Sequence, residues 1–318
     1  MRKITFNYLT ILYYMNTNYP FPTNINDDKP ELVRAYKKLV SLNNDKNYPG
    51  EKSVNTLRLC VYNVNRFGFL YNSNEKIFEF IKKINPDVIS LIEYENYPND
   101  KFFFGINNKF TFMEHSVNYG ILTMTPLHHD FLRKQITDTN LINENTGFTH
   151  CCIRNINIIT VHLDVFIESG RKRLCEIFEI HEYVVINRLK NVILIGDFNE
   201  MNIDNTHPLY EEYKIDFQKR TGYTDIPNLT HDFLHKLKYI DAYSLFGDSD
   251  YYPKFSCWSG KLVDYCYIWG TTWDNNIKIA DINLPMFQYS NHLPIVIDIQ
   301  LDEPQDDAIY RNSYLDDI

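Results

Sequence analysis

The chain has 318 residues, 44% of them hydrophobic, which is enough to bury a large core in one domain. Its formal net charge is -9 and its pI is near 5.6, which excludes a global basic field that would hold nucleic acid without specificity. Any contact with a phosphate group must therefore come from a local patch or a bound metal ion. No apolar stretch is long enough to predict a membrane span.

The cysteines and the N-terminus bear on the compartment. The six cysteines show no C-x-x-C spacing and mostly lie inside apolar runs, which is typical of reduced, buried thiols. Asn7 and Thr10 interrupt the apolar stretch from Ile4 to Met15, and no small-residue cleavage site follows it, so we expect no signal peptide. We therefore expect an intracellular protein, in the cytoplasm or the nucleus. We also expect a monomer.

The chain divides into three segments by composition. Residues 1–55 are rich in Asn, Tyr and Asp and predict a partly ordered extension with one helix at residues 30–41. Regular apolar periodicity begins at Leu57, so we place the main domain at residues 56–301. Residues 302–318 are acidic and poor in core formers, which predicts a disordered tail.

Within the main domain, apolar periodicity predicts strands and helices in irregular alternation. Strands are predicted at residues 57–65, 87–93, 110–114, 119–124, 148–154, 156–162, 192–195, 261–269, 277–284 and 293–299. Helices are predicted at residues 74–84, 171–189, 209–219 and 231–238. The predicted inward face of the helix at 171–189 comprises Leu174, Ile177, Phe178, Val184 and Val185. Because short turns join several adjacent strands, we predict an α/β (α+β) four-layer sandwich of two packed mixed β-sheets flanked by helices.

The stretch Asn191 to Glu200, NVILIGDFNE, combines a buried strand with a polar end. Its apolar run predicts a strand buried on both faces, and Gly196 then allows a tight turn. Asp197 and Asn199 follow at the C-terminal end of the strand, where many α/β enzymes present catalytic groups. A plain Asx turn is the alternative for this motif taken alone.

Polar side chains also occur at or next to the ends of several other predicted strands. With Asp197 and Asn199, the full set is Asn63, Asn65, Glu93, His162, Asp197, Asn199, Asp264, Asn291 and His292. If these strand ends lie on one side of a sandwich, their side chains converge on one cleft. Carboxylate and amide oxygens suit Mg²⁺ or Mn²⁺ better than zinc.

Six short motifs carry a resemblance to a known family. They are YNVN at 62–65, LIE at 91–93, VHLD at 161–164, GDFNE at 196–200, VDY at 263–265 and SNHLP at 290–294. In this order they resemble the endonuclease/exonuclease/phosphatase superfamily, which has the fold of pancreatic deoxyribonuclease. The resemblance implies a deoxyribonuclease I-like sandwich and a divalent-metal-dependent phosphoester hydrolase.

The resemblance also implies a metal site. Glu93 would be the principal metal carboxylate, helped by Asn63 and Asn65. Asn291 stands where the family usually has aspartate. Its amide oxygen can still bind a metal ion but carries no charge, so we expect weak Mg²⁺ binding.

The remaining motif residues are implied to act on the substrate. Asp197 would orient or deprotonate the attacking water, and Asn199 would hold a phosphoryl oxygen. His292, polarised by Asp264, would stabilise negative charge that develops on the phosphorus centre. His162 would lie near the leaving oxygen and could act as a general acid. The resemblance gives no chemical role to the residue that follows GDFN.

The substrate is open to three interpretations. His162 matches the deoxyribonuclease, sphingomyelinase and tyrosyl-DNA phosphodiesterase branches and argues against an abasic-site repair enzyme. We favour a nuclease or DNA-end phosphodiesterase acting on nucleic acid. A phosphatase or phosphodiesterase for inositol phosphates or phospholipids is the alternative, and a catalytically weak relative that binds nucleic acid or protein is the second. Tyr119 and Trp258 could stack on a base or a lipid, or pack in the core. Arg171 could contact phosphates or lie in a solvated turn.

Overall fold

We describe the protein from a computed structural model. It describes residues 49–53, 55–67, 73–94, 111–115, 120–125, 130–135, 147–165, 170–202, 210–222, 228–246, 253, 255–257, 261–271, 273–274, 277–285, 287 and 289–301. The helix predicted at residues 30–41 and the tail predicted at residues 302–318 lie outside these residues.

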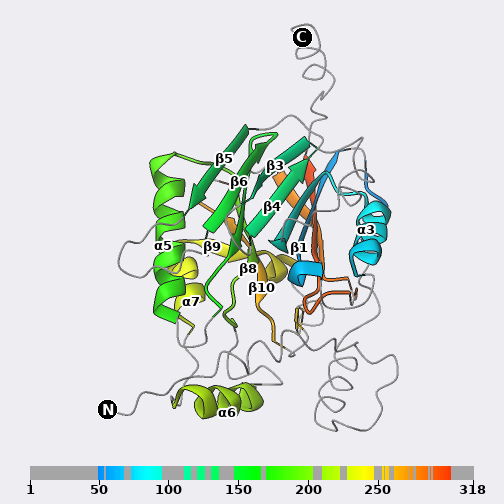
Figure 1. Cartoon of the computed structure of the whole chain (residues 1–318). Coiled ribbons are helices and arrows are strands. Elements are labelled where there is room, and N and C mark those ends of the chain that lie inside the picture. The colour runs from blue at the N-terminus through cyan, green and yellow to red at the C-terminus, as the bar shows by residue number, and fades with distance from the viewer. Residues whose placement is uncertain are drawn as a thin grey trace, which may run out of the picture.

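Two six-stranded mixed β-sheets pack against each other (Figure 1). Sheet A has the order β11-β12-β1-β2-β4-β3, with strands β1 (Thr56–Asn63), β2 (Val88–Tyr94), β3 (Thr111–His115), β4 (Gly120–Thr125), β11 (Ile277–Asn283) and β12 (Ile295–Leu301). Sheet B has the order β5-β6-β7-β8-β10-β9, with strands β5 (Asp130–Gln135), β6 (Gly147–Ile153), β7 (Ile156–His162), β8 (Val192–Asp197), β9 (Tyr239–Asp241) and β10 (Asp264–Trp269). The helices are α3 (Ser73–Ile84), α5 (Gly170–Ile186), α6 (Tyr210–Thr221), α7 (Leu229–Lys236) and the 3-10 turns η1 (Asn65–Phe67) and η3 (Ala242–Phe246).

The two sheets meet through alternate side chains of their central strands. Leu57, Leu59 and Val61 of β1 share one buried cluster with Ile193 and Ile195 of β8. Successive side chains of a strand point to opposite faces, so every second residue of β1 and β8 faces the partner sheet. Both strands are buried on both faces, because helices cover the outer side of each sheet.

The outer layers are formed by α3 and α5, which lie on opposite sides of the sandwich in Figure 1. Ile77 and Phe80 of α3 pack with Tyr62 of β1 on sheet A. Ile177 and Val184 of α5 belong to the cluster that covers sheet B, together with core residues of β7, β8 and β10. This helix–sheet–sheet–helix order confirms the predicted four-layer sandwich.

The inward face of α5 differs from the prediction. Phe178 and Val185 are 48% and 49% exposed, so the prediction was wrong for both. Arg173 and Glu176 are buried instead. Charged side chains are usually exposed, so apolar periodicity does not predict these two at a buried position. Both are buried here because they form hydrogen bonds with the backbone of Asp164, just after β7.

Two edge strands of sheet B were not predicted. The strand β9 has only three residues, and β5 has the mostly polar sequence DFLRKQ, so neither shows a clear apolar alternation. All six cysteines lie in the described residues: Cys60, Cys151, Cys257 and Cys266 are buried, whereas Cys152 and Cys175 are half-buried. Within the described part of the chain, no helix has the length and apolar character needed to cross a membrane.

Candidate active site

Three polar side chains lie side by side at one end of sheet B. His162 and Asp197 end the parallel strands β7 and β8, and the strand register pairs them. The antiparallel strand β10 begins with Asp264, opposite Asp197. Gly196 is needed beside this row, because a Cβ atom there would lie 2.1 Å from the carbonyl oxygen of Val161. Any side chain at this position would push β8 away from β7.

Sheet A supplies side chains that face this row. Asn63 ends β1, and Glu93 lies near the end of β2. The φ angle of Glu93 is 54°, and the pairing of β2 with β4 shifts register just before Tyr94. This local bulge turns the Glu93 side chain out of the ladder. Asn63 Nδ2 donates to Asp197 Oδ2 at 3.1 Å, which links the two sheets.

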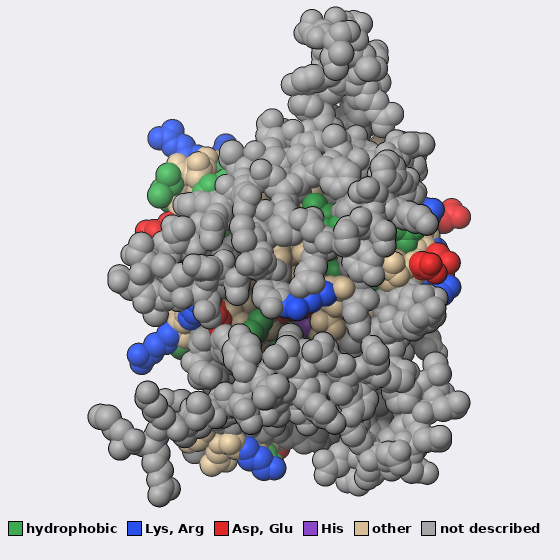
Figure 2. Space-filling view, viewed as in Figure 1, with side chains coloured by type: hydrophobic (Ala, Val, Ile, Leu, Met, Phe, Trp, Pro, Cys, Tyr) green, Lys and Arg blue, Asp and Glu red, His purple; other side chains and the backbone are tan. Residues whose placement is uncertain are grey.

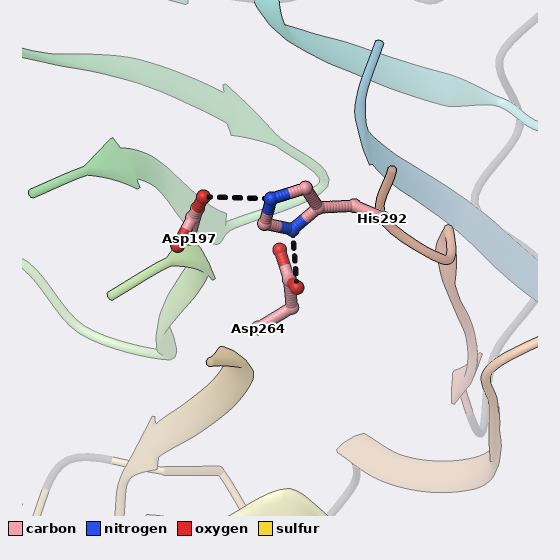
Figure 3. A group of neighbouring side chains, drawn as sticks. All are labelled: Asp197, Asp264 and His292. Carbon is pink, nitrogen blue, oxygen red and sulfur yellow. Dashed lines mark hydrogen bonds and ion pairs between the residues drawn. The ribbon is translucent and has the colours of Figure 1, made fainter. Parts of the chain in front are cut away.

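His292 and Asp264 form a buried pair across the sandwich (Figure 3). His292 Nδ1 lies 2.8 Å from Asp264 Oδ2, and Ser256 Oγ donates to the same oxygen at 2.6 Å. Burial opposes the charged imidazole, but Asp264 and Asp197 outweigh it and raise the pKa of His292 well above its ordinary value. Burial raises the pKa of Asp264 to about 6, against the attraction of His292. At neutral pH the two side chains therefore form an ion pair.

Asp197 lies between two imidazole rings. Its Oδ2 atom is 3.7 Å from His292 Nε2 and 3.9 Å from His162 Nε2. His162 Nε2 also lies 3.7 Å from Glu93 Oε1. These separations are too long for hydrogen bonds. His162 Nε2 is buried and has no hydrogen-bond partner within the described residues, so it faces a position that a bound water or substrate atom would fill.

Asn199 is held by the turn that follows β8. Its φ angle is 49°, and its backbone N–H donates to Asp197 Oδ1 at 2.9 Å, which is an Asx turn. Its side-chain Nδ2 donates to the carbonyl oxygen of Leu163 at 2.9 Å. The Asx turn proposed as the alternative for GDFN is thus present, and it also fixes Asn199 beside the site. The second amide hydrogen and the amide oxygen are further bonding positions for a ligand.

A candidate cation site lies between Glu93 and Asp197. Asn63 Nδ2 lies 3.2 Å from Glu93 Oε1 and 3.1 Å from Asp197 Oδ2, so the two carboxylates share one amide. Two carboxylates brought together need compensating positive charge, and hard oxygen donors fit Mg²⁺ or Mn²⁺. Ligand atoms of Asp197, Asp264 and His292 also lie within 4.8 Å of one another. The ion pair already accounts for His292 Nδ1, which leaves the Glu93 end of the group as the candidate cation site.

The two further predicted metal ligands flank this group. Asn65 is half-buried, and its backbone N–H donates to Asn63 Oδ1 at 3.0 Å. Asn291 is half-buried next to Ser290, whose Oγ lies 3.1 Å from Asn291 Oδ1 and 2.6 Å from the carbonyl oxygen of Asn63. Both asparagines are therefore tied to the end of β1.

The predicted substrate contacts lie outside this group or outside the described residues. Arg171 is exposed in the first turn of α5. Tyr119 and Trp258 lie outside the described residues. Figure 2 shows a histidine side chain beside Lys or Arg side chains near the middle of the drawn face.

The sequence analysis did not predict a role for Ser256. No motif marks a lone serine whose hydrogen-bond partner, Asp264, lies eight residues away.

Comparison with known proteins identifies the fold. No protein-family model and no curated protein sequence matches the chain. The human Nocturnin catalytic domain with bound sulfate anion matches with a TM-score of 0.56 and 16% identity, over 79% of this chain and 96% of that one. An AP endonuclease from Archaeoglobus fulgidus matches with a TM-score of 0.54 and 14% identity, over 78% and 100%. D. rerio TDP2 complexed with single strand DNA product matches with a TM-score of 0.52 and 14% identity, over 77% and 99%.

At these identities the similarity shows the fold. It covers most of this chain and nearly all of each matched chain. The chain therefore has the fold of these structures, in agreement with the deoxyribonuclease I-like sandwich that its motifs predicted.

Proposed function

We propose that the protein is a divalent-metal-dependent phosphoester hydrolase that acts on nucleic acid, as a nuclease or a DNA-end phosphodiesterase. The observation that carries the proposal is the position of Asp197 Oδ2 between His292 Nε2 and His162 Nε2, at 3.7 and 3.9 Å. Hydrolysis of a phosphodiester needs an in-line water, positive charge against the non-bridging oxygens and a proton for the leaving group. The site brings candidates for these tasks within one small volume.

The cation would be held by the strand ends of sheet A. Glu93 would supply the carboxylate, and Asn65 and Asn291 would supply amide oxygens. Asn63 would supply a third amide oxygen by turning its amide, whose Nδ2 now faces Glu93 Oε1 at 3.2 Å. Mg²⁺ or Mn²⁺ bound there would polarise a phosphoryl oxygen and offset its negative charge. Because only Glu93 is charged among these four ligands, we expect weak binding.

The residues of sheet B and the His292 segment would act on the reacting atoms. Asp197 Oδ2 would accept a hydrogen bond from the attacking water, orient it in line and take its proton as the new P–O bond forms. His292 would direct its Nε2–H to a phosphoryl oxygen, and Asp264 keeps it charged. Asn199 would donate its second amide hydrogen to another phosphoryl oxygen. His162 Nε2, buried without a hydrogen-bond partner among the described residues, would give a proton to the leaving oxygen.

Nucleic acid is the favoured substrate class for two reasons. The His162 position matches branches that cut phosphodiesters, and two similar structures are named for an AP endonuclease and for TDP2 with a single strand DNA product. The same catalytic groups would also serve inositol phosphates and phospholipids. Activity toward each class must therefore be measured side by side.

The test measures hydrolysis of bis-p-nitrophenyl phosphate, plasmid DNA, 5′-tyrosyl DNA, inositol phosphate and sphingomyelin, each with Mg²⁺ and with Mn²⁺. We expect cleavage of a nucleic acid substrate, loss of that cleavage with EDTA, and loss in Asp197→Ala. The matched control is Asp241→Ala, since Asp241 is buried in the same sheet and its Oδ1 accepts a hydrogen bond from the Tyr243 N–H, at 3.0 Å. Activity that survives Asp197→Ala, or no activity with any metal, would refute the proposal.

A further inference from the structure

Glu200, the residue after GDFN, is buried among polar partners behind the candidate site. Its Oε2 atom lies 3.0 Å from Arg173 Nε and accepts a hydrogen bond from Thr230 Oγ1 at 2.9 Å. Its Oε1 atom accepts the Thr230 backbone N–H at 2.8 Å, in the first turn of α7. Burial raises the pKa of Glu200, and Arg173 and the Thr230 contacts oppose this rise. Each carboxylate oxygen of Glu200 is thus satisfied by fixed donors.

Arg173 connects Glu200 to the end of β7. Its Nη1 atom donates to the carbonyl oxygen of Asp164 at 3.1 Å, two residues after His162. Glu176, one turn along α5, accepts the Asp164 backbone N–H at 3.0 Å. The side chain of Asp164 pairs with Lys172 of the same helix. The first turns of α5 therefore hold the backbone that follows His162.

The segment that follows β7 and the segment that follows β8 are connected at two places. On the side of the site, Asn199 Nδ2 donates to the carbonyl oxygen of Leu163, and the Leu163 N–H donates to the carbonyl oxygen of Asp197, both at 2.9 Å. On the far side, the ion pair of Glu200 with Arg173 joins the residue after Asn199 to the residue after Leu163. A displacement of either segment would break contacts at both ends.

We propose that Glu200 and Arg173 are positioning residues that fix His162 and Asn199 relative to each other for the reaction, an inference that rests on the proposed function. A buried ion pair contributes little net stability, because desolvation of both charges offsets their attraction. The ion pair acts here by fixing the distance between the two loops that carry His162 and Asn199, whose side chains would act on the same phosphate. Misplacement of reacting groups by about 1 Å can lower a rate by about 10²-fold.

A second buried ion pair offers a matched control. Arg58 Nε lies 2.6 Å from Asp298 Oδ1, and Arg58 Nη1 donates to the carbonyl oxygen of Ile84 at 2.9 Å. Like the Arg173 pair, it joins a buried arginine to a carboxylate and includes a backbone carbonyl contact. Arg58 lies near the start of β1, whereas Asn63 ends that strand at the site. Its loss should affect stability and leave the site geometry intact.

The experiment compares the double variants Arg173→Met/Glu200→Leu and Arg58→Met/Asp298→Leu, each of which removes both charges of its ion pair. Melting temperature is measured, and kcat and KM are determined on DNA, whose leaving oxygen needs a proton, at saturating Mg²⁺. We expect both proteins to fold. In the Arg173 pair variant, kcat should fall by about 10²-fold with KM nearly unchanged, whereas the Arg58 pair variant should keep the wild-type kcat.

Hydrogen exchange of the Leu163 and Asn199 amides gives a readout that needs no activity. Both amides should exchange faster in the Arg173 pair variant and at the wild-type rate in the control. Glu200→Gln, which keeps one acceptor oxygen for Thr230 and removes the charge, should show the same pattern more weakly. Wild-type kcat and exchange rates in the Arg173 pair variant, or failure of both Glu200 variants to fold while the control folds, would overturn the proposal. An inactive wild-type protein would refute the proposed function, and the exchange rates would still test the positioning.

Discussion

Asp264→Asn should remove the negative charge from the buried pair of Asp264 and His292 while keeping the shape of the side chain. The asparagine keeps the size of the side chain and can still accept a hydrogen bond from Ser256 Oγ, which lies 2.6 Å from Asp264 Oδ2. It removes the negative charge that faces His292 Nδ1 at 2.8 Å. We expect the pKa of His292 to fall, and the imidazole to lose its proton in the neutral range.

The size of the effect follows from the distance and the burial. At 2.8 Å and an effective dielectric constant of about 20, Coulomb's law gives an attraction of about 6 kcal/mol. Loss of hydration offsets part of it, and a neighbouring opposite charge typically shifts a pKa by about 1–3 units. This equals about 1.4–4 kcal/mol, a range similar to the loss of one preorganised donor at a developing oxyanion, which lowers kcat by about 10²–10³-fold.

The sign of the pH dependence follows from the same pair. The pKa of His292 is raised above 6.5 in the folded protein. The stability that this charge contributes is therefore complete below about pH 6.5 and is lost as the pH rises through the raised value. On the acid side, protonation of Asp264 near its pKa of about 6 breaks the pair and should lower activity. Asp264→Asn should remove this acid limb and move the alkaline limb toward neutral pH.

The assay combines the pH profile of kcat/KM with an NMR titration of the His292 ring. Asp241→Asn is the matched control, since it makes the same change at a buried aspartate of sheet B whose partner is the Tyr243 N–H. We expect the control to keep the wild-type profile. An unchanged pKa of His292 in Asp264→Asn, or an equal loss of activity in both variants, would refute this reasoning.

Three further substitutions test other parts of the site. His162→Gln should lower kcat by about 10²–10⁴-fold on DNA and much less on bis-p-nitrophenyl phosphate, whose leaving group needs no proton; equal losses would contradict the general-acid role. Asn291→Asp should lower the Mg²⁺ concentration needed for half-maximal activity, and an unchanged or higher requirement would sink the account of weak metal binding. Gly196→Ala should lower the free energy of unfolding by about 1–3 kcal/mol, because its Cβ would lie 2.1 Å from the Val161 carbonyl oxygen; a wild-type urea midpoint would contradict the close approach.

The polar strand ends were predictable because they depend on local signals. Alternating apolar residues indicate a strand, and the first polar residue after the run shows where it ends. The parallel strands β7 and β8 end together, so His162 and Asp197 are neighbours in the observed register. Glu93 is brought to the same region by the parallel pairing of β1 with β2. Ordinary strand periodicity therefore accounts for much of the candidate site.

The contacts behind the site could not be predicted from the same signals. Arg173 lies on a helix whose apolar stripe assigns charged residues to solvent, yet it is buried against Glu200. Its burial depends on an acceptor 27 residues away and on α7, which supplies Thr230. Periodicity carries no information about such pairings, because they form only after the sheets and helices have packed.

The candidate site is divided between the two sheets, so the distances between its side chains depend on how the sheets pack. Sheet A and the segment before β12 supply Asn63, Glu93 and His292, whereas sheet B supplies His162, Asp197 and Asp264. The hydrogen bonds of Asn63 with Asp197, at 3.1 Å, and of His292 with Asp264, at 2.8 Å, both cross the sandwich. A shift of about 1 Å between the sheets would break both hydrogen bonds and misplace the reacting groups. The apolar cluster between the sheets therefore sets the relative positions of the candidate site residues, and neither sheet alone supplies the complete set.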